Sequence, residues 1–109
     1  MLLAIALATA GCAATDDSGS AARPLTAADY EAILVDPARP EADKKDDAAR
    51  KPAEVLAFSE IRPGDTVLEM EAGRGWYSEL LSAAVGPQGK LIVQYPPQFN
   101  YGDAAFKAR

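Results

Sequence analysis

A short segment in the second half of the sequence combines the residue types that a ligand-binding turn requires. Residues 66–70 have the pattern of a short buried strand. The five residues that follow it without a spacer are Glu71, Ala72, Gly73, Arg74 and Gly75. Glycine takes positive φ values and lets a backbone approach a ligand closely, and a helix that begins here directs free N–H groups to the same place. The pattern predicts a ligand-binding turn, although a Gly-x-Gly turn also occurs in α/β proteins that bind nothing there.

The charges of this turn select among ligands. Glu69 at the end of the strand and Glu71 within the turn repel the pyrophosphate of a dinucleotide. They suit a ligand with positive groups, such as a sulfonium and an ammonium. Ser78 stands where the dinucleotide-binding pattern has its third glycine or alanine. These features argue against a nicotinamide-linked oxidoreductase, which stays open as a further alternative.

The segments on either side of the turn predict the elements that position it. Residues 76–85 repeat apolar side chains at helical spacing and end at Gly86-Pro87. Residues 90–95 then form a second segment of strand type, bounded by Pro96-Pro97. Strand, turn, helix and strand make a βαβ unit, in which a ligand binds at the carboxyl edge of the strands.

Upstream of this unit the sequence predicts a short helix that begins at Thr26. Thr26 suits an N-cap, and Asp29 lies in the first turn. Three apolar residues fall on one face before Asp36-Pro37 ends the helix, namely Tyr30, Ile33 and Leu34. We expect the helix to pack onto the rest of the domain through this face.

Two further helical segments are expected before the strand. Between residues 41 and 51 the acids precede the bases by four residues three times, which predicts one solvated helix. Pro52 suits the first turn of another helix. Its apolar contacts are expected from Val55, Leu56 and Phe58. Arg62-Pro63-Gly64-Asp65 has the composition of the turn that closes it.

The composition excludes several classes of protein. A length of 109 residues with 49% hydrophobic and 25% charged side chains suits one modest soluble domain. The chain has no histidine and one cysteine, so it cannot form a Ser-His-Asp triad, a four-ligand Cys/His zinc site or an intrachain disulfide. No metal site is expected. A net charge of -5 disfavours nucleic acid as a partner.

The N-terminus has the pattern of an export signal. Residues 2–10 are uncharged and apolar, too few to span a bilayer but suitable for a signal-peptide core. Gly11-Cys12 then resembles the end of the lipobox of bacterial lipoproteins. We expect a signal peptide over residues 1–11, and a lipidated Cys12 with a flexible tether over residues 12–24. This resemblance implies a bacterial cell-envelope protein that is lipid-anchored and faces the periplasm; the alternative is a cytosolic protein with an unmodified thiol.

Residues 61–81 resemble the first motif of class I S-adenosylmethionine-dependent methyltransferases. The likeness is closest to a bacterial branch of predicted, often exported methyltransferases, and it extends over residues 30–97. That branch has an Arg-x-Pro segment upstream, matched by Arg50-Lys51-Pro52, and a Gly-x-Gly-Trp-Tyr turn. The resemblance implies an α/β, Rossmann-like methyltransferase fold in partial form, with N-terminal helices and the first βαβ unit in residues 25–109.

The resemblance also implies a cofactor, S-adenosyl-L-methionine. Glu69 would neighbour its methionine end, Gly73 and Gly75 would pass beneath it, and Arg74 would reach its carboxylate. Gln94 stands near the place of the family's ribose-binding acid and can make one hydrogen bond to the ribose. The expected cofactor-binding residues are Glu69, Glu71, Ala72, Gly73, Arg74, Gly75 and Gln94.

Methyl transfer mainly requires alignment of donor and acceptor, so no catalytic residue and no particular acceptor is predicted. The family's complete sheet is larger than the one that this sequence predicts, and we therefore expect a truncated chain that carries the cofactor-binding half. The alternative is a non-catalytic or degenerate module that is anchored in the cell envelope and binds a nucleoside-like ligand. This alternative arises because S-adenosylmethionine is made in the cytosol, so an exported enzyme has no obvious supply of its methyl donor.

Two side chains near the turn, Trp76 and Arg50, keep two interpretations each. Trp76 belongs either to the core or to a stacking contact with the adenine of a ligand. Tyr77 is expected in the core. Arg50 either contacts the acceptor or the cofactor carboxylate, or forms a surface ion pair with Asp46.

Overall fold

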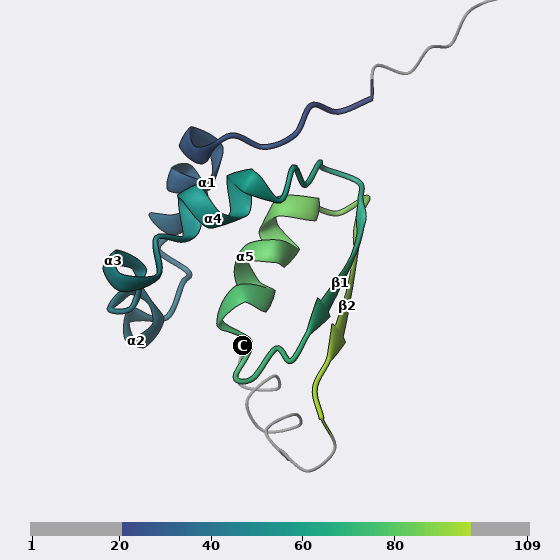
Figure 1. The fold of residues 1–109 in the computed structure, drawn as a ribbon. Helices are drawn as coiled ribbons and strands as arrows, with labels where there is room; N and C mark the ends of the chain where they lie inside the picture. Colours follow the sequence, from purple (N-terminus) through teal and green to yellow (C-terminus); the bar gives the residue numbers. More distant parts are fainter. Residues whose placement is uncertain (1–20, 97–109) are drawn as a thin grey trace, which may run out of the picture.

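Short helices and a pair of strands succeed one another along the chain (Figure 1). The structure is a computed structural model that describes residues 21–96. The elements are α1 Ala27–Leu34, α2 Glu41–Lys44, α3 Asp47–Arg50, α4 Pro52–Phe58, β1 Thr66–Met70, α5 Trp76–Val85 and β2 Lys90–Gln94. They form a small mixed α/β domain with two parallel strands and several helices. The expected signal peptide, Cys12 and most of the expected tether lie outside the described residues.

The two strands pair in parallel, as the βαβ pattern predicts. Thr66 lies opposite Lys90, and Met70 lies opposite Gln94. Burial alternates along both strands, because successive side chains point to opposite faces of the sheet. Helix α5 lies on one side of the sheet, between the strands and the helices α1 and α4 (Figure 1). The other face carries three exposed apolar side chains, Leu68, Met70 and Ile92.

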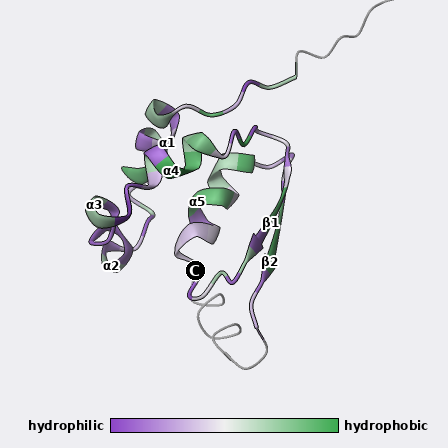
Figure 2. Cartoon of the chain, in the orientation of Figure 1, coloured by the Kyte–Doolittle hydropathy of each residue, from purple (hydrophilic) through white to green (hydrophobic). Residues whose placement is uncertain are grey.

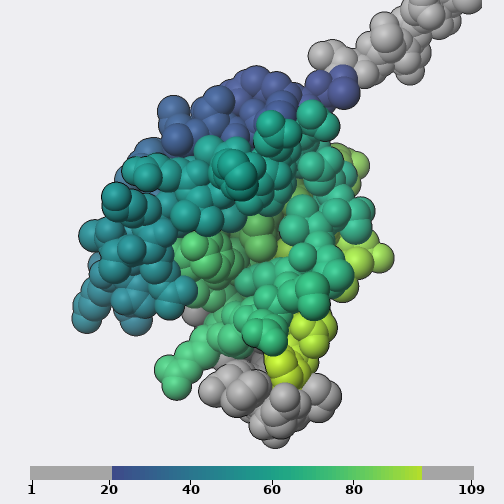
Figure 3. All heavy atoms as spheres, in the orientation of Figure 1, coloured from purple at the N-terminus to yellow at the C-terminus, as the bar shows by residue number. Residues whose placement is uncertain are grey.

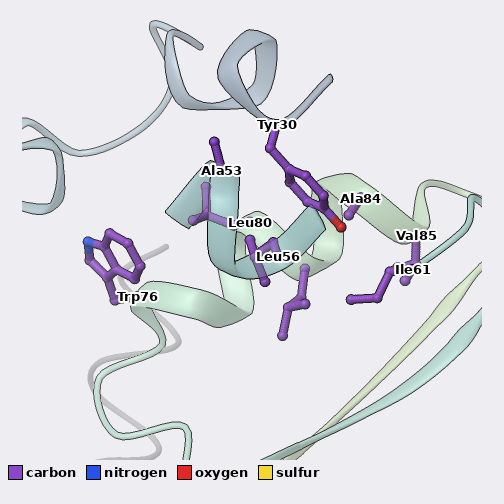
Figure 4. Close-up of a cluster of buried hydrophobic side chains, with 9 residues drawn as sticks. Tyr30, Ala53, Leu56, Ile61, Trp76, Leu80, Ala84 and Val85 are labelled. Carbon is purple, nitrogen blue, oxygen red and sulfur yellow. The ribbon is translucent and has the colours of Figure 1, made fainter. Parts of the chain in front are cut away.

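The core lies between α5 and the N-terminal helices. Figure 2 shows hydrophobic residues along α4, α5 and the strands. Figure 4 shows how side chains from α1, α4 and α5 meet, with Trp76 at one end of the cluster and Ile61 and Val85 at the other. The buried apolar residues are Tyr30, Ala53, Leu56, Ile61, Trp76, Leu80, Leu81, Ala84 and Val85. The helices α1 and α4 therefore hold α5, which in turn begins at the predicted ligand-binding turn.

The prediction for α1 is confirmed. The Thr26 hydroxyl accepts a hydrogen bond from the Asp29 amide, and the Asp29 carboxylate accepts one from the Thr26 amide at 2.7 Å. This reciprocal pair is a capping box, which satisfies two free donors at the start of a helix. Tyr30 is fully buried, and Ile33 and Leu34 pack against the core.

The prediction of one helix between residues 41 and 51 is wrong. The segment forms two one-turn helices, α2 and α3. Asp47 turns toward Arg39 and binds its guanidinium at 2.8 and 3.0 Å, instead of pairing with Lys51. Arg39 is buried, and a buried charge without a partner is costly. The pairing of Asp47 with Arg39 therefore stabilises the chain more than a solvent-exposed pair between Asp47 and Lys51 would. Of the three predicted pairs, the described structure contains the one between Asp46 and Arg50, at 3.7 Å.

Helix α4 packs by a narrower face than predicted. It begins at Pro52, as expected, and buries Pro52, Ala53 and Leu56. Val55 is 48% exposed and Phe58 is 91% exposed, so the prediction that these two residues supply core contacts is wrong. Residues three apart share a helix face, and Ala53 and Leu56 define the face that meets the core. Val55 and Phe58 fall outside it.

Candidate functional site

The turn between β1 and α5 reverses the chain through an unusual run of backbone conformations. Glu71, Gly73 and Gly75 have φ values of 55°, 58° and 81°. A positive φ is routine for glycine but unfavourable for a side chain with a Cβ. Glu71 thus adopts a backbone conformation that glycine takes more readily. The tight turn brings the end of the strand directly under the start of the helix.

The end of β2 holds this turn in place. The backbone oxygen of Gln94 accepts a hydrogen bond from the Ala72 amide at 3.1 Å. The side-chain oxygen of Gln94 accepts another from the Glu71 amide at 3.2 Å. The expected ribose-binding residue is therefore a support for the turn. The sequence gives no sign of this contact, because it joins residues 23 positions apart.

Other amides of the turn have no protein acceptor. Within residues 21–96, the N–H groups of Gly73 and Arg74 donate no hydrogen bond, and no side chain caps the start of α5. The first N–H groups of a helix lack intrahelical partners and carry a partial positive charge. A Cβ added at Gly73 would meet nothing closer than the Glu71 carbonyl at 4.0 Å. The turn thus presents unpaired donors beside open space.

Glu69 connects the strand to the helix. Its side chain lies on the α5 side of the sheet, and a carboxylate oxygen accepts a hydrogen bond from the Ser78 hydroxyl at 2.5 Å. Burial raises the pKa of the Glu69 carboxyl above its ordinary value, and the hydrogen bond from Ser78 opposes part of this shift. Ser78 is thus a neighbour of the candidate site, a role that the sequence analysis did not assign to it. An acid at a strand end with a hydroxyl in the first turn of the next helix is the signal that would have found it.

Trp76 fastens the N-terminal helices to the start of α5. Its indole is buried, and its Nε1 donates a hydrogen bond to the Asp43 carbonyl at 3.0 Å. The guanidinium of Arg50 lies 4.6 Å from the ring centroid, and that of Arg39 lies 5.9 Å from it. Of its two interpretations, the structure places Trp76 in the core (Figure 4). Tyr77 is half-buried and meets the Trp76 ring edge-on at 4.7 Å.

A cleft of about 820 Å³ runs along β1 and the turn. Its lining includes Arg50, Glu69, Glu71, Ala72, Gly73, Arg74, Trp76 and Tyr77. Two expected site residues lie elsewhere. Gly75 borders a second hollow of about 470 Å³ between α5 and β2, and Gln94 supports the turn from behind. Figure 3 shows the green surface of the turn and of the start of α5 bordered by the teal surface of the preceding helices.

Two kinds of feature are absent from the described part of the chain. Residues 21–96 contain no group of three acidic, histidine or cysteine side chains that could coordinate a metal ion. None of the helices in this range has the length and apolar composition to cross a bilayer. The candidate site therefore consists of carboxylates, guanidinium groups and backbone amides.

Comparison with known proteins identifies no relative. No family model matches the sequence, and neither the curated proteins nor the solved structures give a match. The function proposed below consequently rests on the residues and their geometry.

Proposed function

We propose that this chain carries the cofactor-binding part of an S-adenosylmethionine-dependent methyltransferase, with β1, α5 and β2 as the first unit of a Rossmann-like sheet. The observation that carries the proposal is the turn from Glu71 to Gly75, with unpaired amides and flanking carboxylates on a cleft of about 820 Å³. Clefts of roughly 300–1,000 Å³ bury most of the surface of a small-molecule ligand.

The charges around the turn suit the parts of this cofactor. Glu69 and Glu71 would attract its sulfonium and ammonium groups, since both line the cleft. The unpaired backbone amides of Gly73 and Arg74 would face the carboxylate of the cofactor. Gln94, the expected ribose-binding residue, supports the turn and is not among the residues that line this cleft. When bound, the cofactor supplies a methyl group already activated by its sulfonium, and the protein aligns it and excludes water.

The proposal extends to the N-terminus. Cys12 carries lipid and anchors the domain to the bacterial cell envelope on the periplasmic side, with residues 13–24 as a tether. Metabolic labelling with a palmitate analogue tests this: the wild-type chain is labelled and Cys12→Ser is not. Equal labelling of both proteins contradicts the anchor.

Calorimetric titration tests the cofactor. We expect saturable binding of S-adenosylmethionine and S-adenosylhomocysteine to the wild-type chain, and its loss in Gly73→Val, because a β-branched residue is strained at a φ of 58° and projects over the turn. The matched control is Gly64→Val, at another glycine of positive φ with open space around it. Circular dichroism checks that both variants fold. No heat up to millimolar ligand contradicts the proposal, as does a preference for NADH.

One observation favours the second candidate, a non-catalytic module for a nucleoside-like ligand. Gln94 replaces an acid that would hold both ribose hydroxyls, and its side-chain oxygen is already engaged by the Glu71 amide. A weaker hold on the ribose suits a domain that does not orient a methyl donor. Adenosine that binds as tightly as S-adenosylmethionine in the same titration would favour this candidate.

A further inference from the structure

Arg50 is a charged side chain of the cleft that comes from outside the turn. It ends α3 and lines the cleft together with the turn residues Glu71 and Arg74. Its guanidinium lies 4.6 Å from the centroid of the Trp76 ring. Because Trp76 is buried and is the first residue of α5, Arg50 is held beside the turn from a segment that precedes β1.

Two arginines contact this indole, and their partners differ. The Arg39 side chain is 3% exposed, and it binds Asp47 at 2.8 and 3.0 Å and the Leu34 carbonyl at 2.9 Å. The Arg50 side chain is 46% exposed, and its contact with Asp46 is a loose ion pair of 3.7 Å. Arg39 is therefore a structural cation. Arg50 is held by its contact with the indole and keeps N–H donors for another acceptor.

A cation–π contact with an aromatic ring prepares a guanidinium for an anion. The contact restricts the position of the group, while its N–H donors match a carboxylate in two parallel hydrogen bonds. A flexible side chain must lose conformational entropy when it binds, and one that is held by a ring has already lost part of it. Arg74 also lines the cleft, but it is exposed on the turn and has no such ring contact in the described structure.

We propose that Arg50 binds the carboxylate of the amino-acid portion of the ligand in this cleft. The inference rests on the proposed function and deepens it. An α-amino acid group carries a positive and a negative charge close together, and the cleft presents Glu71 and Arg50 on its lining as complementary charges. The carboxylate of the cofactor is thus recognised by a residue of the N-terminal helices.

Two ligands separate this role from a structural one. S-adenosylhomocysteine has the amino-acid portion, and 5′-methylthioadenosine has the same nucleoside and thioether without it. In Arg50→Gln, the Kd of S-adenosylhomocysteine should rise by about tenfold or more, since a hydrogen-bonded charge is lost, while the Kd of 5′-methylthioadenosine stays unchanged. Arg50→Lys should recover part of the loss, because lysine keeps the charge but not the paired donors. Calorimetry measures the constants, and thermal unfolding checks that each variant folds.

Asp46→Asn is the matched control, because it removes the one ion pair that Arg50 makes in the described structure without altering Arg50 itself. It should bind S-adenosylhomocysteine at least as tightly as the wild-type chain. Equal weakening of both ligands by Arg50→Gln, or no weakening of either, overturns the carboxylate role and leaves the proposed function standing. A wild-type chain that binds neither ligand overturns both.

Discussion

Glu71 occupies the most constrained position of the site, with a side chain at a φ of 55°. A residue with a Cβ in this left-handed region costs about 1–2 kcal/mol relative to a right-handed one, and glycine avoids most of that cost. We expect Glu71→Gly to raise the free energy of unfolding by about 1 kcal/mol, measured by urea denaturation. Glu71→Gln is the control, since it keeps the strain and removes the charge. A Glu71→Gly variant less stable than Glu71→Gln would contradict this account.

Glu69 gives a pH dependence with a definite sign. Its pKa is raised in the folded chain, so the folded state takes up the proton before the unfolded state as the pH falls. The ionised carboxylate therefore lowers stability at neutral pH, and this effect disappears as the pH approaches about 4. Glu69→Gln should have a higher Tm than the wild type at pH 7, with a difference that narrows toward pH 4 in thermal unfolding. A difference that widens on acidification would refute the assigned cause.

The sequence predicts the roles of residues that contact their neighbours along the chain. It does not predict contacts between residues that are far apart in the sequence. The Thr26 cap and the glycines of the turn act on neighbours within a few positions, so their types suffice to predict them. The hydrogen bond from Trp76 to the Asp43 carbonyl spans 33 positions. Such a contact depends on how α2 and α5 pack, which residue type alone does not specify.

At the scale of the elements, the pairing of Arg39 with Asp47 decides the shape of the segment before α4. Removal of Asp47 leaves a buried guanidinium without its carboxylate, which costs up to about 3–5 kcal/mol for a fully buried pair. Asp47 is 22% exposed, so we expect Asp47→Asn to lower the free energy of unfolding by about 2 kcal/mol. Urea denaturation measures the change.

The control for that experiment lies one residue earlier. Asp46 makes an exposed ion pair, so Asp46→Asn should change stability by about 0.5 kcal/mol or less. Equal losses in the two variants would show that the buried pair does not organise the segment. The same comparison explains why the predicted helix over residues 41–51 is wrong. The spacing of charges predicts ion pairs within one helix, whereas Asp47 pairs with Arg39, which lies outside the predicted helix.

The βαβ unit is the part of the fold that the sequence predicts well. The bounds of β1 and α5 are those that the apolar spacing predicts, and Gly86 ends the helix as expected. Strand β2 ends at Gln94, one residue before its predicted end. Periodicity shows which face of α1 or α4 is apolar but not which element covers it. The stacking of these helices on α5, which makes most of the core, therefore emerges only in the structure.

For the whole molecule, the sheet has one face that no described element covers. Leu68 and Ile92 lie opposite each other in the strand pairing, and both are exposed. Contiguous exposed apolar side chains favour association. We expect self-association that increases with concentration in sedimentation analysis, and its reduction in Leu68→Lys, with Phe58→Lys as a control at an exposed position on α4. A monomer at all concentrations would contradict the expectation.

The support of the turn by Gln94 couples the candidate site to the pairing of the two strands. The amides of Glu71 and Ala72 are protected only while the end of β2 is in place. Local unfolding that released β2 would therefore also disorder the turn. The amides of the turn and those of β2 should thus exchange their hydrogens at the same rate. A ligand that binds in the cleft would then stabilise the pairing of the two strands. It would slow hydrogen exchange along β2, including at residues that it does not contact.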